Sequence, residues 1–259
     1  MNLNFSVKKT TFSPPNRNSI GLRIFRVAWS LFIEKIVNCK DVLLGFIDES
    51  FVCACEGQKY GRAFRGLSPV VQAPLSKKKV SVIALVLPCF GVLYDFINGS
   101  VNDECYLNFL QRAVIFIRKY ICNKDCEIVL IEDNCKIHQS KMMEKKISDL
   151  KIGLLPTVQY SPSLNGPVEG YFGIVKENSY INSDNKSDAS ILYSIKHIWK
   201  LISDDNFDVE TSENLYIEWI QRLQICKHGE PIYSGHLPID EDLKVNLDIR
   251  TDIPVDRLI

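Results

Sequence analysis

An apolar run of 15 residues, VSVIALVLPCFGVLY, constrains the fold more than any other feature and extends from Val80 to Tyr94. A helix that spans a membrane needs about 20 such residues, and Pro88 and Gly91 interrupt this run. A turn between two buried strands accommodates both residues. We therefore predict a β-hairpin in the core of a soluble protein, with no membrane as a partner.

The segments around this hairpin alternate between strand and helix patterns. DVLLGFIDESFVCA precedes it as a buried strand, and Asn102 or Asp103 is expected to cap a helix that runs to about Tyr120. EIVLIEDN and IGLLPTVQY read as strands, each followed by a helix, HQSKMMEKKISDL and PVEGYFGIVKENSYI. The order predicts an α/β fold with a mixed sheet, in which three antiparallel strands precede alternating helices and strands.

The net charge of zero hides an uneven distribution along the chain. Residues 1–40 carry seven basic residues and one acid, whereas residues 200–259 carry 13 acids and six basic residues. Neutrality alone would argue against a nucleic-acid-binding protein. The separation of charge removes that objection, because the basic excess lies ahead of the predicted sheet and the acidic excess lies after it.

Three acids fall at the ends of predicted elements: Asp48 in the first strand, Asp133 after EIVLIE, and Glu169 in the first turn of a helix. Each has an ordinary structural explanation, as a strand end, a turn residue or a favourable first-turn acid. Together they suit a site rich in oxygen ligands, which favours Mg²⁺ or Mn²⁺. Two such ions can activate a nucleophile and stabilise the leaving oxygen in phosphodiester chemistry.

Four segments in this order, FIDES, GRAFRG, IEDNCKIH and YSPSLNGPVEGYFGIVK, resemble the DDE endonuclease domain of mariner-like transposases and their bacterial insertion-sequence relatives. The resemblance implies a ribonuclease-H-like fold. It also implies that Asp48, Asp133 and Glu169 are the catalytic acids that hold two Mg²⁺ or Mn²⁺ ions. There are 35 residues between Asp133 and Glu169, one more than is usual in the family. Gly166 is the inserted residue, and we expect it to affect the position of Glu169.

The same resemblance suggests supporting or nucleic-acid-binding residues. His138 either approaches a phosphate and supports Asp133 or caps the next helix, and Asn134 either orients Asp133 or forms a turn. Lys176 follows Glu169 on one helix face and is either a contact to the DNA backbone or a solvated lysine. Arg65 and Asn165 complete the set.

The nine cysteines do not form a zinc motif. Neither Cys53-x-Cys55 nor Cys122-x-x-x-Cys126 has the spacing of a zinc ribbon, and no pair of histidines completes four ligands. The odd number, together with a start that lacks a secretory signal, predicts reduced thiols in an intracellular protein. We expect no zinc.

The resemblance divides the chain into three parts. Residues 1–40 form a basic linker and helix that resemble the end of an N-terminal DNA-binding region. Residues 41–182 form the catalytic domain, and residues 183–259 form a mostly helical, acidic C-terminal extension. We expect the helix-turn-helix modules that read transposon ends in this family to be missing.

Two functions follow from this division. The first is metal-dependent DNA cleavage and strand transfer on transposon ends and target DNA, by a protein that forms a homodimer. The second is an inactive or domesticated nucleic-acid-binding or scaffold protein; a nuclease that cleaves RNA–DNA hybrids is a weaker third option. The expected location is the nucleus for a eukaryotic element and the cytoplasm for a bacterial one.

Overall fold

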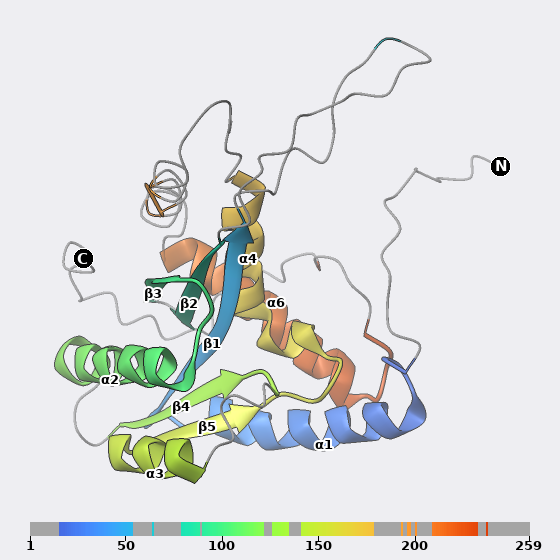
Figure 1. The fold of residues 1–259 in the computed structure, drawn as a ribbon. Helices are drawn as coiled ribbons and strands as arrows, with labels where there is room; N and C mark the ends of the chain where they lie inside the picture. The colour runs from blue at the N-terminus through green and yellow to red at the C-terminus, as the bar shows by residue number, and fades with distance from the viewer. Residues whose placement is uncertain are drawn as a thin grey trace.

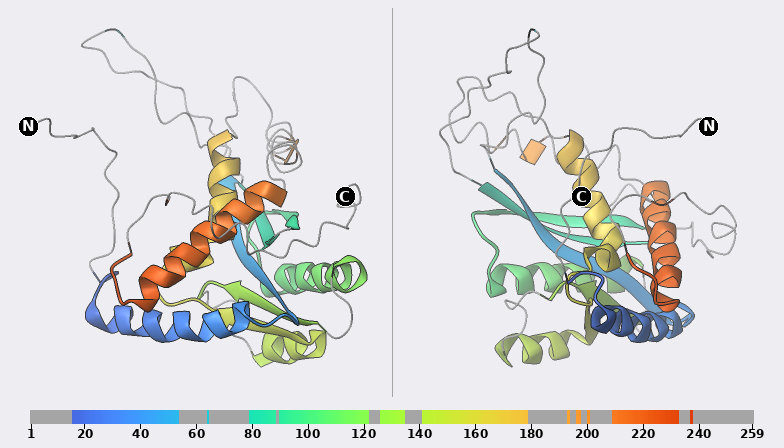
Figure 2. Two further views of the ribbon diagram at one scale, coloured as in Figure 1. Left: turned by 180° about the vertical axis from the view of Figure 1, so that it is seen from behind. Right: turned by 90° about the vertical axis from the view of Figure 1, so that its right-hand side faces the viewer.

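The computed structural model describes residues 16–53, 64, 79–88, 90–121, 126–134, 141–178, 193, 196–197, 200, 209–232 and 237. Within these residues, a sheet of five strands lies between two layers of helices (Figures 1 and 2). None of the described helices is long and apolar enough to cross a membrane.

The strand order is β3-β2-β1-β4-β5. The strands are β1 (Val42–Cys53), β2 (Lys79–Leu87), β3 (Gly91–Asn98), β4 (Glu127–Glu132) and β5 (Ile152–Pro156). The first three pair antiparallel, and β4 and β5 add parallel to the other edge of β1. This is the mixed sheet expected from the sequence, and the hairpin is confirmed: β2 and β3 are joined by a turn in which Gly91 has a φ of +97°.

Strand β1 is the centre of the sheet because it pairs with β2 on one side and β4 on the other. Gly45 makes this close packing possible. A Cβ at this position would lie 2.8 Å from Leu130 Cδ2 and 2.9 Å from Leu85 Cδ1, which is closer than real side chains approach.

The helices cover the sheet on both faces. One face packs against α2 (Asp103–Tyr120) and α3 (Lys141–Leu150), and the other against α1 (Ile20–Val37), α4 (Gly166–Asn178) and α6 (Val209–Lys227) (Figure 2). Side chains alternate between the two layers, so that Phe46 and Ile131 face α4 and α6 while Ile47 and Leu130 face α2 and α3.

The helix boundaries follow local signals. Asn102 caps α2 as expected, since its Oδ1 accepts a hydrogen bond from Cys105 N at 2.9 Å. Helix α4 follows a short 3₁₀ helix, η2 (Pro162–Asn165), and begins at Gly166, so Glu169 lies in its first turn. The last predicted strand is shorter in the structure, since it ends at Pro156 instead of Tyr160. Of the helical segment expected over 188–228, α6 covers 209–227, residues 193, 196, 197 and 200 are helical, and the rest of 188–208 lies outside the described residues.

The cysteines differ in part from the expectation of reduced thiols. Cys39, Cys105 and Cys226 are free thiols, but Cys126 is disulfide-bonded. The expectation was therefore wrong for Cys126, because the absence of a recognisable secretory signal carries no information about an individual thiol.

The two glycines at the start of α4 give a stability prediction. A Cβ at Gly170 would lie 2.5 Å from Leu215 Cδ2 on α6, whereas one at Gly166 would make ordinary contacts of 3.6 Å with Trp219. We expect Gly170→Ala to lower the free energy of unfolding by about 1–3 kcal/mol through overpacking. Gly166→Ala should be neutral or stabilise by up to about 1 kcal/mol, since its backbone is helical. Urea unfolding followed by tryptophan fluorescence measures both; equal losses would contradict this packing.

Candidate active site

The first two predicted acids lie side by side because β1 and β4 are parallel. Their register pairs Phe46 with Ile131. Continued by two residues it sets Asp48 opposite Asp133, the first residue after β4, and the charge of Asp133 acts on Asp48. Neighbouring strands are about 4.8 Å apart. Both acids alternate onto the sheet face that packs against α4 and α6.

Helix α4 brings the third acid to the same face. Val168 and Phe172, on either side of Glu169 along the helix, are buried in the cluster that contains Phe46. Asn165 strengthens this placement because its Nδ2 donates a hydrogen bond to Ile47 O at 3.1 Å. The start of α4 is therefore fixed to the backbone immediately before Asp48.

The electrostatics show that these acids interact. Burial, the charge of Glu169 and, to a smaller extent, the charge of Asp133 together raise the pKa of Asp48 to about 8. Glu49 N opposes this shift by donating a hydrogen bond to Asp48 Oδ1 at 2.7 Å. Burial also raises the pKa of Glu169, with Lys176 opposing the shift and Asp133 adding to it.

Three carboxylates with mutual repulsion match the donor chemistry of a hard divalent cation, which would relieve that repulsion. As placed in the described part of the chain, no three His, Cys, Asp or Glu side chains lie close enough together to coordinate one ion. The type and placement of the donors therefore fit a metal, although their spacing is wider than that of a coordination shell.

The supporting residues have different outcomes. Asn134 Nδ2 donates a hydrogen bond to Thr157 O, and Thr157 N donates to Glu132 O at 2.9 Å, so the segment after β4 is attached to the end of β5. Lys176 is exposed on α4. His138 and Arg65 lie outside the described residues.

Lys176 belongs to a cluster that the sequence did not suggest. Its Nζ lies 5.9 Å from the ring centroid of Phe51, and Lys79 Nζ lies 5.4 Å from the same centroid. Phe51 is 49% exposed. We call Phe51, Lys79 and Lys176 the Phe51 cluster. The sequence offers Lys176 as a candidate DNA contact and the run Lys77–Lys79 ahead of the hairpin. It does not place Phe51 with them, since an aromatic residue in a strand usually indicates the core.

A buried polar pair supports β4 from the other face of the sheet. Tyr106 on α2 donates its hydroxyl hydrogen bond to Glu132 Oε2 at 2.9 Å, and both residues are buried. Burial, with the neighbouring charge of Glu132, raises the pKa of Tyr106 well above its usual value. Glu132 is thus directed away from the acid face, although it is adjacent to Asp133 in sequence.

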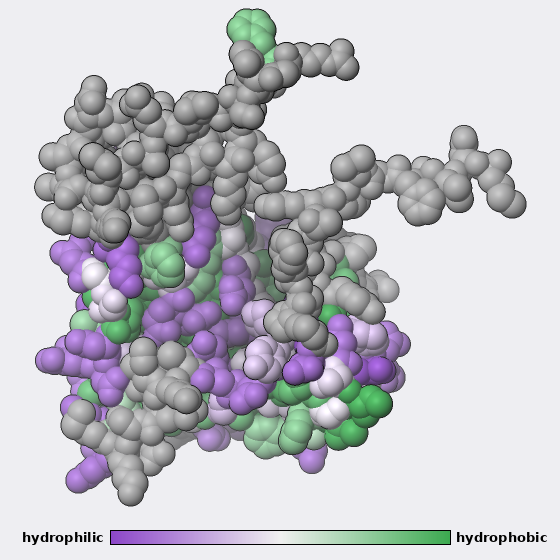
Figure 3. Space-filling model, turned by 45° about the vertical axis from the view of Figure 1, so that its right-hand side comes forward, coloured by the Kyte–Doolittle hydropathy of each residue, from purple (hydrophilic) through white to green (hydrophobic). Residues whose placement is uncertain are grey.

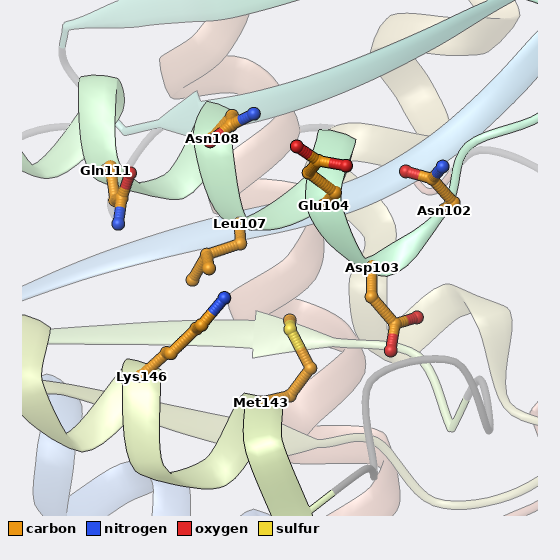
Figure 4. A pocket seen from close by; sticks show the side chains of 8 residues that line it. All are labelled: Asn102, Asp103, Glu104, Leu107, Asn108, Gln111, Met143 and Lys146. Carbon is orange, nitrogen blue, oxygen red and sulfur yellow. The ribbon is translucent and has the colours of Figure 1, made fainter.

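A pocket lies between α2 and α3, on the face of the sheet opposite to the three acids (Figure 4). It has a volume of about 500 Å³ and is lined mainly by polar residues: Asn102, Asp103, Glu104, Leu107, Asn108, Gln111, Met143 and Lys146. None of the predicted site residues lines it, so this pocket is separate from the acid face.

The comparisons with known proteins agree with this geometry. A sequence model described as DDE superfamily endonuclease matches residues 44–191, which is more than half of the chain. This chain belongs to the DDE superfamily endonuclease family.

Two further comparisons give a related transposase sequence and solved structures with the same fold. The Tc3 transposase of Caenorhabditis elegans is 29% identical over 141 residues, which cover 53% of this chain and 40% of that transposase. The chain thus spans less than half the length of this relative.

Among solved structures, a Mos1 mariner paired end complex with Mn has a TM-score of 0.67 at 15% identity, and the match covers 90% of this chain and 69% of that one. A Mos1 catalytic domain with Raltegravir and Mn has a TM-score of 0.58 at 16% identity and is covered completely. These structural matches confirm the ribonuclease-H-like fold.

The raised pKa of Asp48 gives a pH prediction for the metal-free protein. The pKa of this carboxyl is near its ordinary value of 3.8 in the unfolded chain and about 8 in the folded chain. Its ionisation therefore costs nothing below about pH 4, opposes folding increasingly from pH 4 to 8, and reaches its full cost above pH 8. We expect Asp48→Asn in EDTA to raise the free energy of unfolding at pH 7 by up to about 4 kcal/mol.

Urea unfolding at pH 5, 6, 7 and 8 checks this expectation, with Asp149→Asn on α3 as the matched control. The difference between Asp48→Asn and the original protein should grow with pH, and that of the control should stay constant. A difference independent of pH would show that Asp48 is not buried among other negative charges.

Proposed function

We propose that this chain is a transposase-type DDE endonuclease that cleaves a DNA strand and transfers the resulting end. The observation that supports it best is the placement of Asp48, Asp133 and Glu169 on one face of the sheet, where the charge of Asp133 contributes to the raised pKa values of Asp48 and Glu169. Asp48, Asp133 and Glu169 would hold two Mg²⁺ or Mn²⁺ ions once their side chains close around them. The bound ions would stabilise charge on the attacking and leaving oxygens of the phosphodiester.

The reaction is a pair of phosphoryl transfers. In cleavage, the oxygen of water bonds to phosphorus, the bond from phosphorus to the 3′-oxygen breaks, and that oxygen leaves with a proton as a 3′-hydroxyl. In transfer, this hydroxyl attacks a phosphodiester of the target strand and displaces the target's own 3′-oxygen. In both steps an oxygen attacks phosphorus in line with the oxygen that leaves. The same arrangement of acids can therefore serve both steps.

The residues around the acids have proposed roles as well. Asn165 positions α4, and therefore Glu169, relative to Asp48; Asn134 positions the segment that carries Asp133. The Phe51 cluster supplies two cations and an exposed ring, a combination that suits a nucleic-acid backbone and an unstacked base. We retain His138 and Arg65 as candidate DNA contacts. The expected partners are transposon ends, target DNA and a second copy of the chain, and a eukaryotic protein would act in the nucleus.

The catalytic claim predicts that the purified protein nicks supercoiled DNA in the presence of Mn²⁺. Asp133→Asn should reduce the rate by at least about 100-fold, because one ligand and its charge are lost. Asp149→Asn removes an exposed acid from α3 and should retain activity. Gel analysis of nicked circles measures the rate; equal nicking by the Asp133 variant would remove the acids from the mechanism.

The DNA-binding claim concerns the Phe51 cluster. Lys79→Ala and Lys176→Ala should each weaken binding, and each should lower the slope of log affinity against log salt by about one if that lysine contacts a phosphate. Lys119→Ala is the matched control, since Lys119 also lies over an aromatic ring, Tyr120, at 4.8 Å but belongs to α2 on the opposite face. Fluorescence anisotropy at several salt concentrations tests this claim. An unchanged slope in both Phe51-cluster variants would contradict it.

A second function is favoured by the spacing of the acids, since no three potential ligands in the described residues are grouped closely enough for one ion. On this alternative the chain is a domesticated, non-catalytic nucleic-acid-binding or scaffold protein. It predicts no thermal shift with Mg²⁺ or Mn²⁺. A clear shift that disappears in Asp48→Ala would exclude the alternative.

A further inference from the structure

Helix α1 departs in part from the usual amphipathic arrangement. Ile33 is buried as expected, but so are Arg26 and Ser30, each 1% exposed, while Ile24 and Phe25 are 63% and 67% exposed. A surface helix normally buries its apolar residues and directs its charges to water. Helix α1 therefore buries a charged and a polar side chain and leaves several large apolar side chains exposed.

The buried charge is stabilised by specific hydrogen bonds. Arg26 Nε donates to Ser161 Oγ at 2.8 Å, and its two terminal nitrogens donate to Asn18 Oδ1 and to Arg17 O. Glu34 accepts from Lys227 Nζ on α6 at 2.7 Å. These contacts fix the rotation of α1 about its own axis, so the helix cannot turn its apolar face inward without losing them.

The exposed face is a continuous stripe, which we call the α1 stripe. It consists of Ile20, Gly21, Ile24, Phe25, Ala28, Leu31 and Phe32. Figure 3 shows apolar side chains gathered along the lower edge of the molecule, where α1 lies in Figure 1. The five large members are between 42% and 76% exposed. From these fractions the stripe exposes about 600 Å² of apolar surface, at the upper end of the range for the largest patch on a monomer.

Helix α2 shows that this exposure is not general in the protein. It has 18 residues, as α1 has, and packs on the other face of the same sheet. Its exposed positions are polar or charged apart from Ile115, which is 67% exposed, and Tyr120 at the end of the helix. The solvent face of α2 is thus ordinary, and the α1 stripe is an exception.

We propose that the α1 stripe is the interface between two copies of this chain, which pack α1 against α1 in antiparallel orientation. Large residues flank Ala28 symmetrically, with Ile24 and Phe25 at four and three positions before it and Leu31 and Phe32 at three and four positions after it. A two-fold axis at Ala28 therefore brings large side chains of one copy against those of the other, with small residues at the crossing point.

The area and charge of the stripe fit this occupant. Two copies would remove about 1,200 Å² from solvent, the lower bound for a specific protein interface. None of the seven residues of the α1 stripe is charged, so their self-association brings no like charges into the centre of the contact. The inference specifies the surface of the proposed homodimer and does not depend on the proposed chemistry, because assembly is measured without DNA or metal.

The experiment is sedimentation equilibrium of the full chain, whose mass is 29.6 kDa. The original protein should sediment as a dimer at tens of micromolar. Ile24→Glu should weaken association at least about tenfold, as expected for a charge at the centre of an interface. The matched control is Ile115→Glu, with the same substitution at an equally exposed helix position; it should leave association unchanged. Circular dichroism confirms that both variants are folded.

A cross-link tests the position of the axis independently. Cys39 is an exposed free thiol, so the background is Cys39→Ser. In that background Ala28→Cys should form a disulfide-linked dimer on mild oxidation, and Ile115→Cys should not. The proposal would be overturned if the original protein stayed monomeric at all concentrations. It would also be overturned if Ile24→Glu and Ile115→Glu weakened dimer formation equally.

Discussion

The parallel pairing of β1 with β4 is the constraint on which the rest of the site depends. These strands come from segments about 80 residues apart in sequence, and their register places Phe46 beside Ile131. Once this pair is fixed, the residues two positions further along, Asp48 and Asp133, are expected on the same face because side chains alternate along a strand. Gly45, paired with Leu130, allows the two strands to lie against the leucines of β2 and β4 without a clash. The polar pair Tyr106–Glu132 then stabilises the end of β4 from the opposite layer.

The third acid depends on contacts that hold η2 and the start of α4. Asn165 donates to Ile47 O, Trp219 Nε1 donates to Leu164 O at 2.8 Å, and Arg26 donates to Ser161. The donors come from the segment itself, α6 and α1, so three parts of the protein determine the position of Glu169. The stability of the scaffold therefore offsets the cost of placing three carboxylates together, as is common at functional sites.

The sequence predicted the fold well where the signal was local, and it named the three acids as candidates. The apolar run gave the β2–β3 hairpin, Asn102 gave the start of α2, and the four family segments identified Asp48, Asp133 and Glu169. The Phe51 cluster could not be predicted, because it joins a strand end, the first residue of β2 and the last turn of α4. The packing of α1 was equally hidden: its periodicity predicts a helix, but only the contacts of Arg26 show that this charge is buried while Ile24 and Phe25 are exposed.

The central claim is that Asp48 shares one face with two other carboxylates and that a divalent cation relieves their repulsion. The most direct test is an NMR titration of the Asp48 side-chain carboxyl carbon in the folded protein, with and without Mg²⁺. The account predicts a pKa of about 8 without metal and a large decrease when Mg²⁺ binds. A pKa close to the ordinary value for aspartate, unchanged by Mg²⁺, would contradict it.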